Sequence, residues 1–454
     1  MEDLSGKRIL VAGLGKSGLA VVDSLLSGGI RAAVYDAKRP EDIGSERLHM
    51  LKKNGVDCYF GGFPGPFEKF DMIVLSPGIP PEMEFFRNAG QNGCEVIGEL
   101  EFAFRTGRGK YAAITGTNGK TTTTALVGEI FKNAGLDAHV AGNIGIAASS
   151  VCRKARDDSW LITEVSSFQL ETIKYFRPCI SAVLNITPDH LDRHKTMERY
   201  IEAKSRILIN QGESDYFIVN HDDGKAYGLA PCSAAKVVPF SRVTELGFGA
   251  FLNNGIIAVR DEGGKLTEFC RACDLLIPGA HNIENALAAT AISYFAGICP
   301  AVIAGTLKAF RGVEHRLEFA GETGGVRFVN DSKATNPDAA IKGVCAIEGN
   351  IILIAGGYDK SSNYDEFIEA FGDRVKYMAL LGATAYAIKE AAERKGFTNC
   401  VVLKNMEECV NKAFELAEPG DTVLLSPACA SWDMYGSFEE RGNHFKNCVT
   451  RLER

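Results

Sequence analysis

Short apolar runs alternate with amphipathic stretches along most of the chain. Near the N-terminus, residues 7–12 form an apolar run, followed by GLGKSG and an amphipathic segment up to about Ser27. A second apolar run, AAVYD, ends at Asp36, and DMIVLSPGI follows later. Buried parallel strands connected by helices give this pattern. The first block therefore predicts a βαβ domain built on a parallel sheet.

The same pattern starts again twice. YAAIT opens a second series at Tyr111, with a helix to about Asn133, the strands SWLITEV, ISAVLNI and DYFIVN, a hairpin-like region between residues 248 and 278, and the helix HNIENALAATAISYFA. A third series follows RGVEHRLE, with strands VRFVND, NIILIAGG, YMALLGA and DTVLLSPA. TGRGK (106–110) is typical of a linker. We predict an α/β protein of three domains: a Rossmann-like domain over 1–108, a central P-loop-type ATPase domain over 109–312 and a Rossmann-like domain over 313–454.

Composition agrees with several domains and excludes some partners. A chain of 454 residues is longer than one hydrophobic core usually supports. Its net charge of −7 argues against a nucleic-acid or anionic-membrane surface, and no apolar run is long enough to span a membrane. Thirteen cysteines show no disulfide framework, and the CxxC pair of Cys270 and Cys273 lacks a partner pair for zinc. Since the start also lacks a signal peptide's pattern, we expect reduced thiols in the cytoplasm.

The stretch ITGTNGKTTTTAL (114–126) has the context of a phosphate-binding loop, because it follows an apolar strand and begins a helix. Backbone N–H groups in such a loop grip phosphate oxygens, a lysine neutralises the β- and γ-phosphates, and a hydroxyl holds Mg²⁺. Ile114 stands where the longer consensus has glycine, so the match is to a shortened G-x-x-G-K-T form. The alternative is a Gly-Asn-Gly turn capped by threonines. We expect ATP to contact Gly116, Thr117, Asn118, Gly119, Lys120, Thr121 and Thr122.

An earlier glycine loop is less specific. Gly13, Gly15 and Gly18 satisfy G-x-G-x-x-G, and Asp36 ends the next strand where a ribose-binding acid would lie. The pattern is compatible with NAD, FAD or a UDP-sugar, or with glycines needed only for close helix–strand packing.

Three residues of the middle block are candidates for metal chemistry. Glu164 ends the strand SWLITE, where P-loop proteins place a metal-directed acid. His190 follows another strand end, and Lys204 lies in the amphipathic stretch ERYIEAKSRILIN. Taken singly, His190 is better explained as a loop residue at a helix start, and Lys204 as a solvated helical lysine.

Eight motifs occur in an order that resembles the Mur ligase family: GTNGKTT (116–122), GNIG (142–145), EVSSFQLE (164–171), NITPDHLDRH (185–194), HNIENALAA (281–289), EHRLE (314–318), NDSKATNPDA (330–339) and LSPACASWD (425–433). The resemblance covers all three blocks. Within the family, SSFQLE, NDSKATN and SPACAS are most similar to the members that add D-glutamate. The resemblance implies an ATP-dependent amide-forming ligase that joins D-glutamate to UDP-N-acetylmuramoyl-L-alanine through an acyl phosphate.

The resemblance also implies roles for single residues. The expected catalytic group is Lys120, Glu164, His190 and Lys204, with Thr121 and Glu164 at one Mg²⁺ and His190 and a carbamylated Lys204 at a second. Further expected ATP contacts are Asn282, Asn285, Arg316 and Asp331. For the UDP-sugar they are Ser17, Asp36, Gly78, Asn143, Ser166 and Gln169. For D-glutamate they are Lys333, Thr335, Lys360, Ser431 and Phe438. Lys16 and Trp432 depart from the residues typical of the family at their positions. We expect a cytoplasmic monomer acting in peptidoglycan precursor synthesis.

Rival interpretations explain less of the chain. A sibling ligase that adds diaminopimelate would carry a D-N-P-R-type motif where this chain reads TNPDA, and a folylpolyglutamate synthase has no nucleotide-binding block before its P-loop. An NAD-dependent dehydrogenase would explain GLGKSG and Asp36 but leaves Lys120 and the middle block unexplained. A protein using ATP only as a switch would have no need of a second metal at Lys204.

Overall fold

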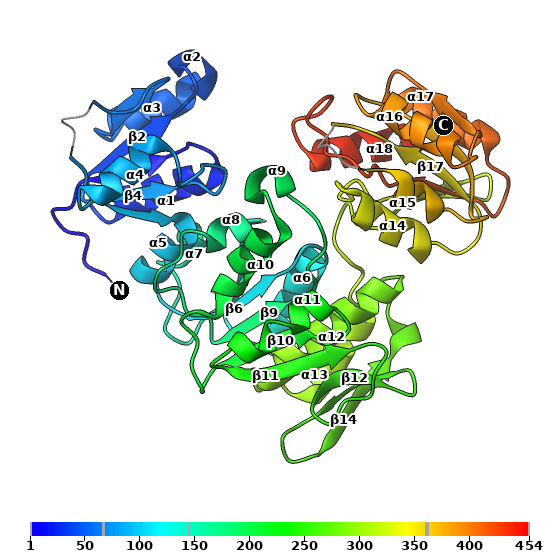
Figure 1. Cartoon of the computed structure of the whole chain (residues 1–454), viewed down its shortest axis with the longest axis horizontal. Helices are drawn as coiled ribbons and strands as arrows, with labels where there is room; N and C mark the ends of the chain where they lie inside the picture. Colours follow the sequence, from blue (N-terminus) through cyan, green and yellow to red (C-terminus); the bar gives the residue numbers. More distant parts are fainter. Residues whose placement is uncertain (1, 66–68, 144, 359–362, 453–454) are drawn as a thin grey trace. The chain divides into compact units, whose positions relative to one another are not determined.

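A computed structural model describes residues 2–65, 69–143, 145–358 and 363–452 (Figure 1). The described residues form three sheets, each with its own helices. Contacts within the chain group them into two compact units. The first unit comprises residues 1–186, 193–270 and 286–306, and the second comprises 187–192, 271–285 and 307–454. The predicted domain limits near residues 108 and 313 remain predictions.

The N-terminal sheet is parallel throughout and has the order β3-β2-β1-β4-β5. Its strands are β1 (Ile9–Ala12), β2 (Ala32–Asp36), β3 (Asp57–Phe60), β4 (Met72–Leu75) and β5 (Glu95–Gly98). Its helices are α1 (Lys16–Ser27), α2 (Pro40–Ile43), α3 (Ser45–Lys53), α4 (Glu84–Gln91) and α5 (Glu99–Thr106). The strand order reverses between β1 and β4, and ligands of such sheets bind at the carboxyl ends of the strands at this point.

The middle sheet has nine strands in the order β14-β13-β12-β11-β10-β9-β6-β8-β7. They are β6 (Lys110–Thr115), β7 (Ala138–Gly142), β8 (Trp160–Glu164), β9 (Ile180–Val183), β10 (Tyr216–Asn220), β11 (Lys236–Ser241), β12 (Gly249–Asn253), β13 (Ile256–Arg260) and β14 (Leu266–Arg271). Its strand order reverses between β6 and β9, so this sheet also has a switch point, at the end of β6. Antiparallel β12 and β13 confirm the hairpin expected between residues 248 and 278.

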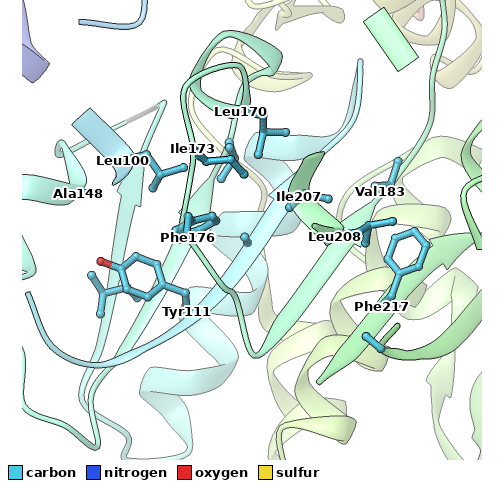
Figure 2. Close-up of a cluster of buried hydrophobic side chains, with 14 of the residues drawn as sticks. Leu100, Tyr111, Ala148, Leu170, Ile173, Phe176, Val183, Ile207, Leu208 and Phe217 are labelled. Atoms are coloured by element: carbon cyan, nitrogen blue, oxygen red, sulfur yellow. The ribbon is translucent and has the colours of Figure 1, made fainter. Parts of the chain in front are cut away.

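The helices that follow β6 in the chain are α6 (Lys120–Asn133), α7 (Ala148–Val151), α8 (Ser167–Leu170), α9 (Leu191–His194), α10 (Met197–Ser205), α11 (Gly224–Tyr227), α12 (Ala280–Phe295) and α13 (Pro300–Ala309). Three short 3₁₀ turns are η1 (Arg206–Leu208), η2 (Ala230–Cys232) and η3 (Ala272–Asp274). Figure 2 shows the hydrophobic core of the middle domain. In this core, Ile207 and Leu208 of η1 belong to the same buried cluster as Val183 of β9 and Phe217 of β10. Burial of η1 in this core anchors the C-terminal end of α10.

The C-terminal sheet has the order β15-β16-β20-β17-β18-β19. Strands β15 and β16 pair antiparallel, and the other four pairs of neighbouring strands described in this sheet are parallel. Its strands are β15 (Glu318–Thr323), β16 (Val326–Asn330), β17 (Ile351–Ala355), β18 (Val375–Leu380), β19 (Cys400–Val402) and β20 (Thr422–Leu425). Its helices are α14 (Pro337–Ala346), α15 (Asp365–Glu369), α16 (Ala385–Arg394), α17 (Met406–Leu416) and α18 (Phe438–Leu452). The three-domain α/β architecture expected from the sequence is confirmed.

Two further expectations can be compared with the structure. All thirteen cysteines are free thiols, Cys270 and Cys273 included. Within the ranges the structure describes, no helix combines the length and apolar character needed to cross a membrane.

Candidate active site

The loop between β6 and α6 has the geometry expected of a phosphate-binding loop. Gly119 immediately precedes α6 with a left-handed φ of 85°, and no side chain caps the helix start. Gly116 has a φ of 149°, and a Cβ there would lie 3.1 Å from the Cβ of Leu184, so glycine is needed. A long helix with an uncapped N-terminus attracts anions through its N–H groups and its dipole.

Two lysines converge on one carbonyl of this loop. The Lys120 Nζ donates to the oxygens of Gly116 (2.9 Å) and Thr117 (2.7 Å), and the Lys204 Nζ also donates to the Gly116 oxygen (2.9 Å). Lys204 is only 1% exposed and lies over the ring of Tyr200, whose hydroxyl is 3.1 Å from the Thr117 hydroxyl. The interpretation of Lys204 as a solvated helical lysine is therefore wrong. Burial of an ammonium among main-chain oxygens requires such a specific partner set.

A carboxylate and a hydroxyl meet at the start of α6. Glu164 ends β8, is buried, and accepts hydrogen bonds from the Thr121 hydroxyl (2.8 Å) and the Asn143 amide (2.9 Å). The structure thus brings together three residues from three separate motifs. Asn143 was expected at the UDP-sugar, whereas its amide here donates to Glu164.

Ser166 and Gln169 belong to a capping box at α8. The Gln169 Oε1 accepts from the backbone N–H and the hydroxyl of Ser166, both at 3.0 Å. Gln169 is 3% exposed, and its Nε2 has no hydrogen-bond partner among the described residues. A buried donor of this kind costs free energy unless a ligand or water accepts from it.

The first glycine loop lies at the switch point of the N-terminal sheet. Asp36 accepts from the backbone N–H groups of Leu14 (2.7 Å) and Lys38 (3.0 Å), and so supports this loop. A Cβ on Gly18 would fall 1.7 Å from the Gly13 oxygen, so close packing alone explains this glycine. The exposed Gly15 and Gly78 have open space around them, and the partly buried Ser17 lies in the first turn of α1.

In the second unit, Arg316 and Asp331 are neighbours. Asp331 follows β16, is fully buried and accepts from the Ser426 hydroxyl (2.9 Å) and the Leu317 N–H (3.3 Å). Burial raises its pKa to about 7, although Arg316 and these donors oppose the rise. Two non-glycine residues with left-handed backbone, His315 (φ 65°) and Leu317 (φ 45°), flank Arg316. Such conformations cost energy and are kept where the surroundings require them.

The other predicted nucleotide and metal residues of this unit lie on its two remaining segments, 187–192 and 271–285. Asn282 and Asn285 are buried on α12, where the Asn282 amide donates to Pro278 O and the Asn285 amide to Asn282 Oδ1. His190 directly precedes α9 with a φ of 53°, and its Nε2 is 3.5 Å from Asp189 Oδ2.

Most of the predicted D-glutamate residues gather around a buried arginine that the sequence analysis did not identify. Arg441 of α18 is 1% exposed and donates to the hydroxyl and carbonyl of Ser332 and to the carbonyls of Cys429 and Ala430. These bonds connect the loop after β16 to the loop after β20. The Ser332 hydroxyl donates to the Phe438 carbonyl, and the Lys333 ammonium lies 4.9 Å from the Phe438 ring centre.

Thr335 and Ser431 lie on the same two loops, after β16 and after β20. The Thr335 N–H bonds Lys333 O, and the buried Ser431 accepts from the backbone of Met434 and Tyr435 through its carbonyl. Lys360 lies outside the described residues.

Three domain models of one protein family match the chain, one over each of the three sheets. The Mur ligase MurD-like N-terminal domain matches residues 7–98, the Mur ligase middle domain matches 114–293, and the Mur ligase glutamate ligase domain matches 315–429. A UDP-N-acetylmuramoylalanine–D-glutamate ligase of Thermoanaerobacter sp. is 48% identical over 100% of both chains. The chain belongs to the Mur ligase family. The ligase of the same name from Clostridioides difficile is 45% identical over 99% of this chain and 100% of its own.

Solved structures of Mur ligases share the fold at lower identity. The ADP complex of MurF from Thermotoga maritima has a TM-score of 0.62 at 16% identity and covers 100% of both chains. The alanine ligase MurC of the same organism has a TM-score of 0.62 at 19% identity, covering 98% of this chain and 100% of its own. Sequence reasoning missed Arg441 and also Asn185, whose side chain bonds the main chain of Asn118 in the P-loop. Asn185 is the first residue of the NITPDHLDRH motif and Arg441 lies outside the eight motifs, and neither position says anything about the partners of the side chain.

Proposed function

We propose that the protein is an ATP-dependent ligase that joins D-glutamate to UDP-N-acetylmuramoyl-L-alanine in cytoplasmic peptidoglycan precursor synthesis, and that it acts as a monomer. The observation that carries this proposal is full-length identity of 48% to a D-glutamate ligase, across all three domains. A phosphate-binding loop with a buried acid beside it supports the ATP-dependent part. The family member solved with ADP supports it further.

Residues of the P-loop would bind the triphosphate of ATP. Lys120 would exchange the carbonyls it now contacts for the β- and γ-phosphates, since phosphate oxygens are better acceptors for an ammonium. Gly116, Thr117, Asn118, Gly119 and Thr122 would contribute the loop's N–H and hydroxyl groups. The buried Thr122 hydroxyl has no partner among the described residues, which fits a donor reserved for a ligand.

Glu164 and Thr121 fit a first Mg²⁺ site. Mg²⁺ is usually held by one or two carboxylates together with substrate phosphates and water, and a P-loop hydroxyl is a common further ligand. Within the described part of the chain, no three His, Cys, Asp or Glu side chains form a metal-binding group, so this site depends on the nucleotide for further ligands. Bound Mg²⁺ would neutralise charge between the γ-phosphate and the acceptor carboxylate.

A second Mg²⁺ would require chemical modification of Lys204. An ammonium cannot bind a cation, whereas a carbamate formed with CO₂ offers anionic oxygens. The buried position of Lys204 against the P-loop supports a role at the γ-phosphate rather than at the surface. His190 is the proposed second ligand.

The remaining nucleotide and UDP-sugar contacts are proposed from the geometry of each unit. Arg316 and Asp331 would contact ATP with Asn282 and Asn285; the Arg316 Nε is buried without a partner among the described residues. For the UDP-sugar we propose Ser17, Asp36, Gly78, Asn143, Ser166 and Gln169. Open space at Gly78 and the unpartnered Gln169 Nε2 support this group most directly.

The reaction would proceed in two steps. The alanine carboxylate of the UDP-sugar attacks the γ-phosphorus of ATP, ADP leaves, and an acyl phosphate forms. The amino group of D-glutamate then attacks the acyl carbon, loses a proton, and phosphate leaves from the tetrahedral intermediate. Lys120 would stabilise charge on the transferred phosphoryl group, and catalysis is otherwise mostly positioning.

D-glutamate is proposed to bind in the second unit at Lys333, Thr335, Lys360, Ser431 and Phe438. A dicarboxylate needs cations and donors, and Lys333 beside Phe438 supplies one.

Phosphate release tests the substrate assignment. The enzyme is incubated with ATP, Mg²⁺ and UDP-N-acetylmuramoyl-L-alanine, and D-glutamate, L-glutamate, L-lysine or diaminopimelate is added in turn. Release that depends on D-glutamate alone is the expected result. Release with another amino acid would retain the chemistry and identify a sibling ligase, the second candidate, and no release with any of them would refute the proposal.

A further inference from the structure

Asn185 extends the sheet beyond the end of its strands by using its side chain. The ladder between β6 and β9 pairs Thr115 with Val183, and the Leu184 N–H then donates to the Thr115 oxygen (3.0 Å). One residue further on, the Thr117 N–H donates to the Asn185 main-chain oxygen (2.9 Å). The Asn185 side chain makes the next two hydrogen bonds to the loop, in place of its main chain. Its Oδ1 accepts from the Asn118 N–H (2.8 Å) and its Nδ2 donates to the Asn118 oxygen (3.0 Å).

We infer that Asn185 is a positioning residue for ATP, because it holds the P-loop in its phosphate-binding conformation through the main chain of Asn118. This inference rests on the ATP-dependent function proposed above and adds a residue to it. The paired bonds fix both the N–H and the carbonyl of Asn118, so the peptide planes on either side of this residue cannot rotate freely. A phosphate-binding loop works only when its N–H groups point to one centre.

The location of Asn118 makes this restraint important. Asn118 directly precedes Gly119, whose left-handed backbone (φ 85°) turns the chain into α6. Glycine populates many backbone conformations, so the turn needs restraint from its neighbours. Lys204 and Tyr200 of α10 contact Gly116 and Thr117, at the beginning of the loop. Asn185 contacts its second half, where the anion-binding helix begins.

A matched control is available on the neighbouring strand. Asn220 of β10 is 3% exposed, and it also makes two side-chain hydrogen bonds to main chain: its Nδ2 donates to the Leu184 oxygen (2.9 Å) and its Oδ1 accepts from the Asp222 N–H (2.9 Å). Asn220 therefore supports the end of β9, next to Asn185, from the neighbouring strand β10. Asn220→Ala thus removes an equal number of bonds of the same type without removing a bond to the P-loop.

The test measures nucleotide affinity directly, by calorimetric titration of the full-length enzyme with ATP and Mg²⁺, together with the thermal unfolding midpoint. Two lost hydrogen bonds correspond to a loss of affinity of about tenfold to a hundredfold. We expect this loss of ATP affinity for Asn185→Ala, whereas Asn220→Ala should bind ATP like the wild type. The two variants should show similar changes in the thermal unfolding midpoint. Asn185→Asp keeps the bond from the Asn118 N–H but places a carboxylate against the Asn118 carbonyl, so it should also bind ATP weakly while remaining folded.

Kinetics provide the second measurement. In the D-glutamate-dependent reaction, the KM for ATP should rise in both Asn185 variants, while the KM for D-glutamate stays within about twofold of the wild type. Affinity for ATP within twofold of the wild type in the Asn185 variants would overturn the inference, as would an equal loss in Asn220→Ala. Because the titration needs no acceptor substrate, a wild type that binds ATP but releases no phosphate would refute the proposed substrates and leave the test of Asn185 intact.

Discussion

The buried carboxyl of Asp331 should make the second unit less stable at neutral pH than at mildly acidic pH. Its pKa is raised to about 7 by burial, against an ordinary value of 3.8. A folded-state pKa above the unfolded one means that folding favours the protonated form. This contribution to stability is complete below about pH 4 and is lost as the pH rises through about 7. The full difference corresponds to about 4 kcal/mol in the free energy of unfolding.

Asp331→Asn removes the titration while keeping the size of the side chain. The amide oxygen can still accept from Ser426, and the weak bond from the Leu317 N–H (3.3 Å) is the main loss, about 1 kcal/mol. At pH 8 the variant should therefore be more stable than the wild type by about 2–3 kcal/mol. The gap should narrow as the pH is lowered and change sign between about pH 4 and 5, where the lost Leu317 bond outweighs the remaining cost of ionising Asp331. The variant should bind ATP more weakly at every pH.

Urea unfolding without nucleotide provides the assay. The chain has two tryptophans, Trp160 in the first unit and Trp432 in the second. In a Trp160→Phe background, fluorescence of Trp432 therefore reports on the second unit. Unfolding curves between pH 5 and 8.5 give the stability gap between wild type and variant at each pH.

Asp421→Asn is the matched control in the same sheet. Burial also disfavours ionisation of Asp421, but the Glu418 N–H, Lys376 and Asn350 outweigh burial and lower its pKa. Its contribution to stability is thus present above the ordinary pKa of Asp and is lost as the pH falls, so Asp421→Asn should destabilise the unit most at pH 8. A gap for Asp331→Asn that does not change with pH, or a variant less stable than the wild type at pH 8, would refute the reasoning.

Three further predictions concern the first unit. Lys204→Ala should nearly abolish turnover, and short-chain carboxylic acids should restore part of it by replacing the carbamate proposed for Lys204; full activity in the alanine variant would exclude a metal-binding role. Glu164→Gln should raise the Mg²⁺ concentration needed for half-maximal phosphate release at least tenfold, since a neutral amide binds Mg²⁺ weakly; an unchanged requirement would contradict the assignment. Glu101→Gln should destabilise the first unit by about 3 kcal/mol, because the buried carboxylate accepts from the N–H groups of residues 174–176 and an amide can accept only part of this set; denaturant midpoints equal to the wild type would exclude this.

Elements with strong local signals were predicted well from the sequence. The helix after the P-loop ends at Asn133 as expected, and AAVYD forms β2 over the same residues. The apolar residues Leu126, Val127, Ile130 and Phe131 of α6 are buried, as are the first four residues of β2, so burial and local preference favour the same structure. Strands β3, β5, β7, β11, β15 and β19 were not predicted. Each has at least two residues that are only half-buried or exposed, so the apolar pattern along each strand is too weak to recognise.

The site residues also differ in how well the sequence predicts them. Its local motifs, the P-loop and the strand-end Glu164, could be read from the order of residue types, because a phosphate-binding turn and a helix start are formed by neighbours in the chain. The resemblance to Mur ligases extended this to residues without a local signal. Their roles as ligand contacts remain predictions.

The sequence by itself determined the three α/β domains, the position of the P-loop and the family. Only the tertiary structure decided that Lys204 is buried on the Gly116 carbonyl, 88 positions away, and that Asn185 restrains Asn118, 67 positions away. The same holds for Arg441, which connects two loops of the C-terminal sheet. Each of these side chains looks like an ordinary polar residue in its own segment. Its function depends on which main-chain groups the fold brings within hydrogen-bonding distance, and periodicity along the chain carries no information about contacts between distant segments.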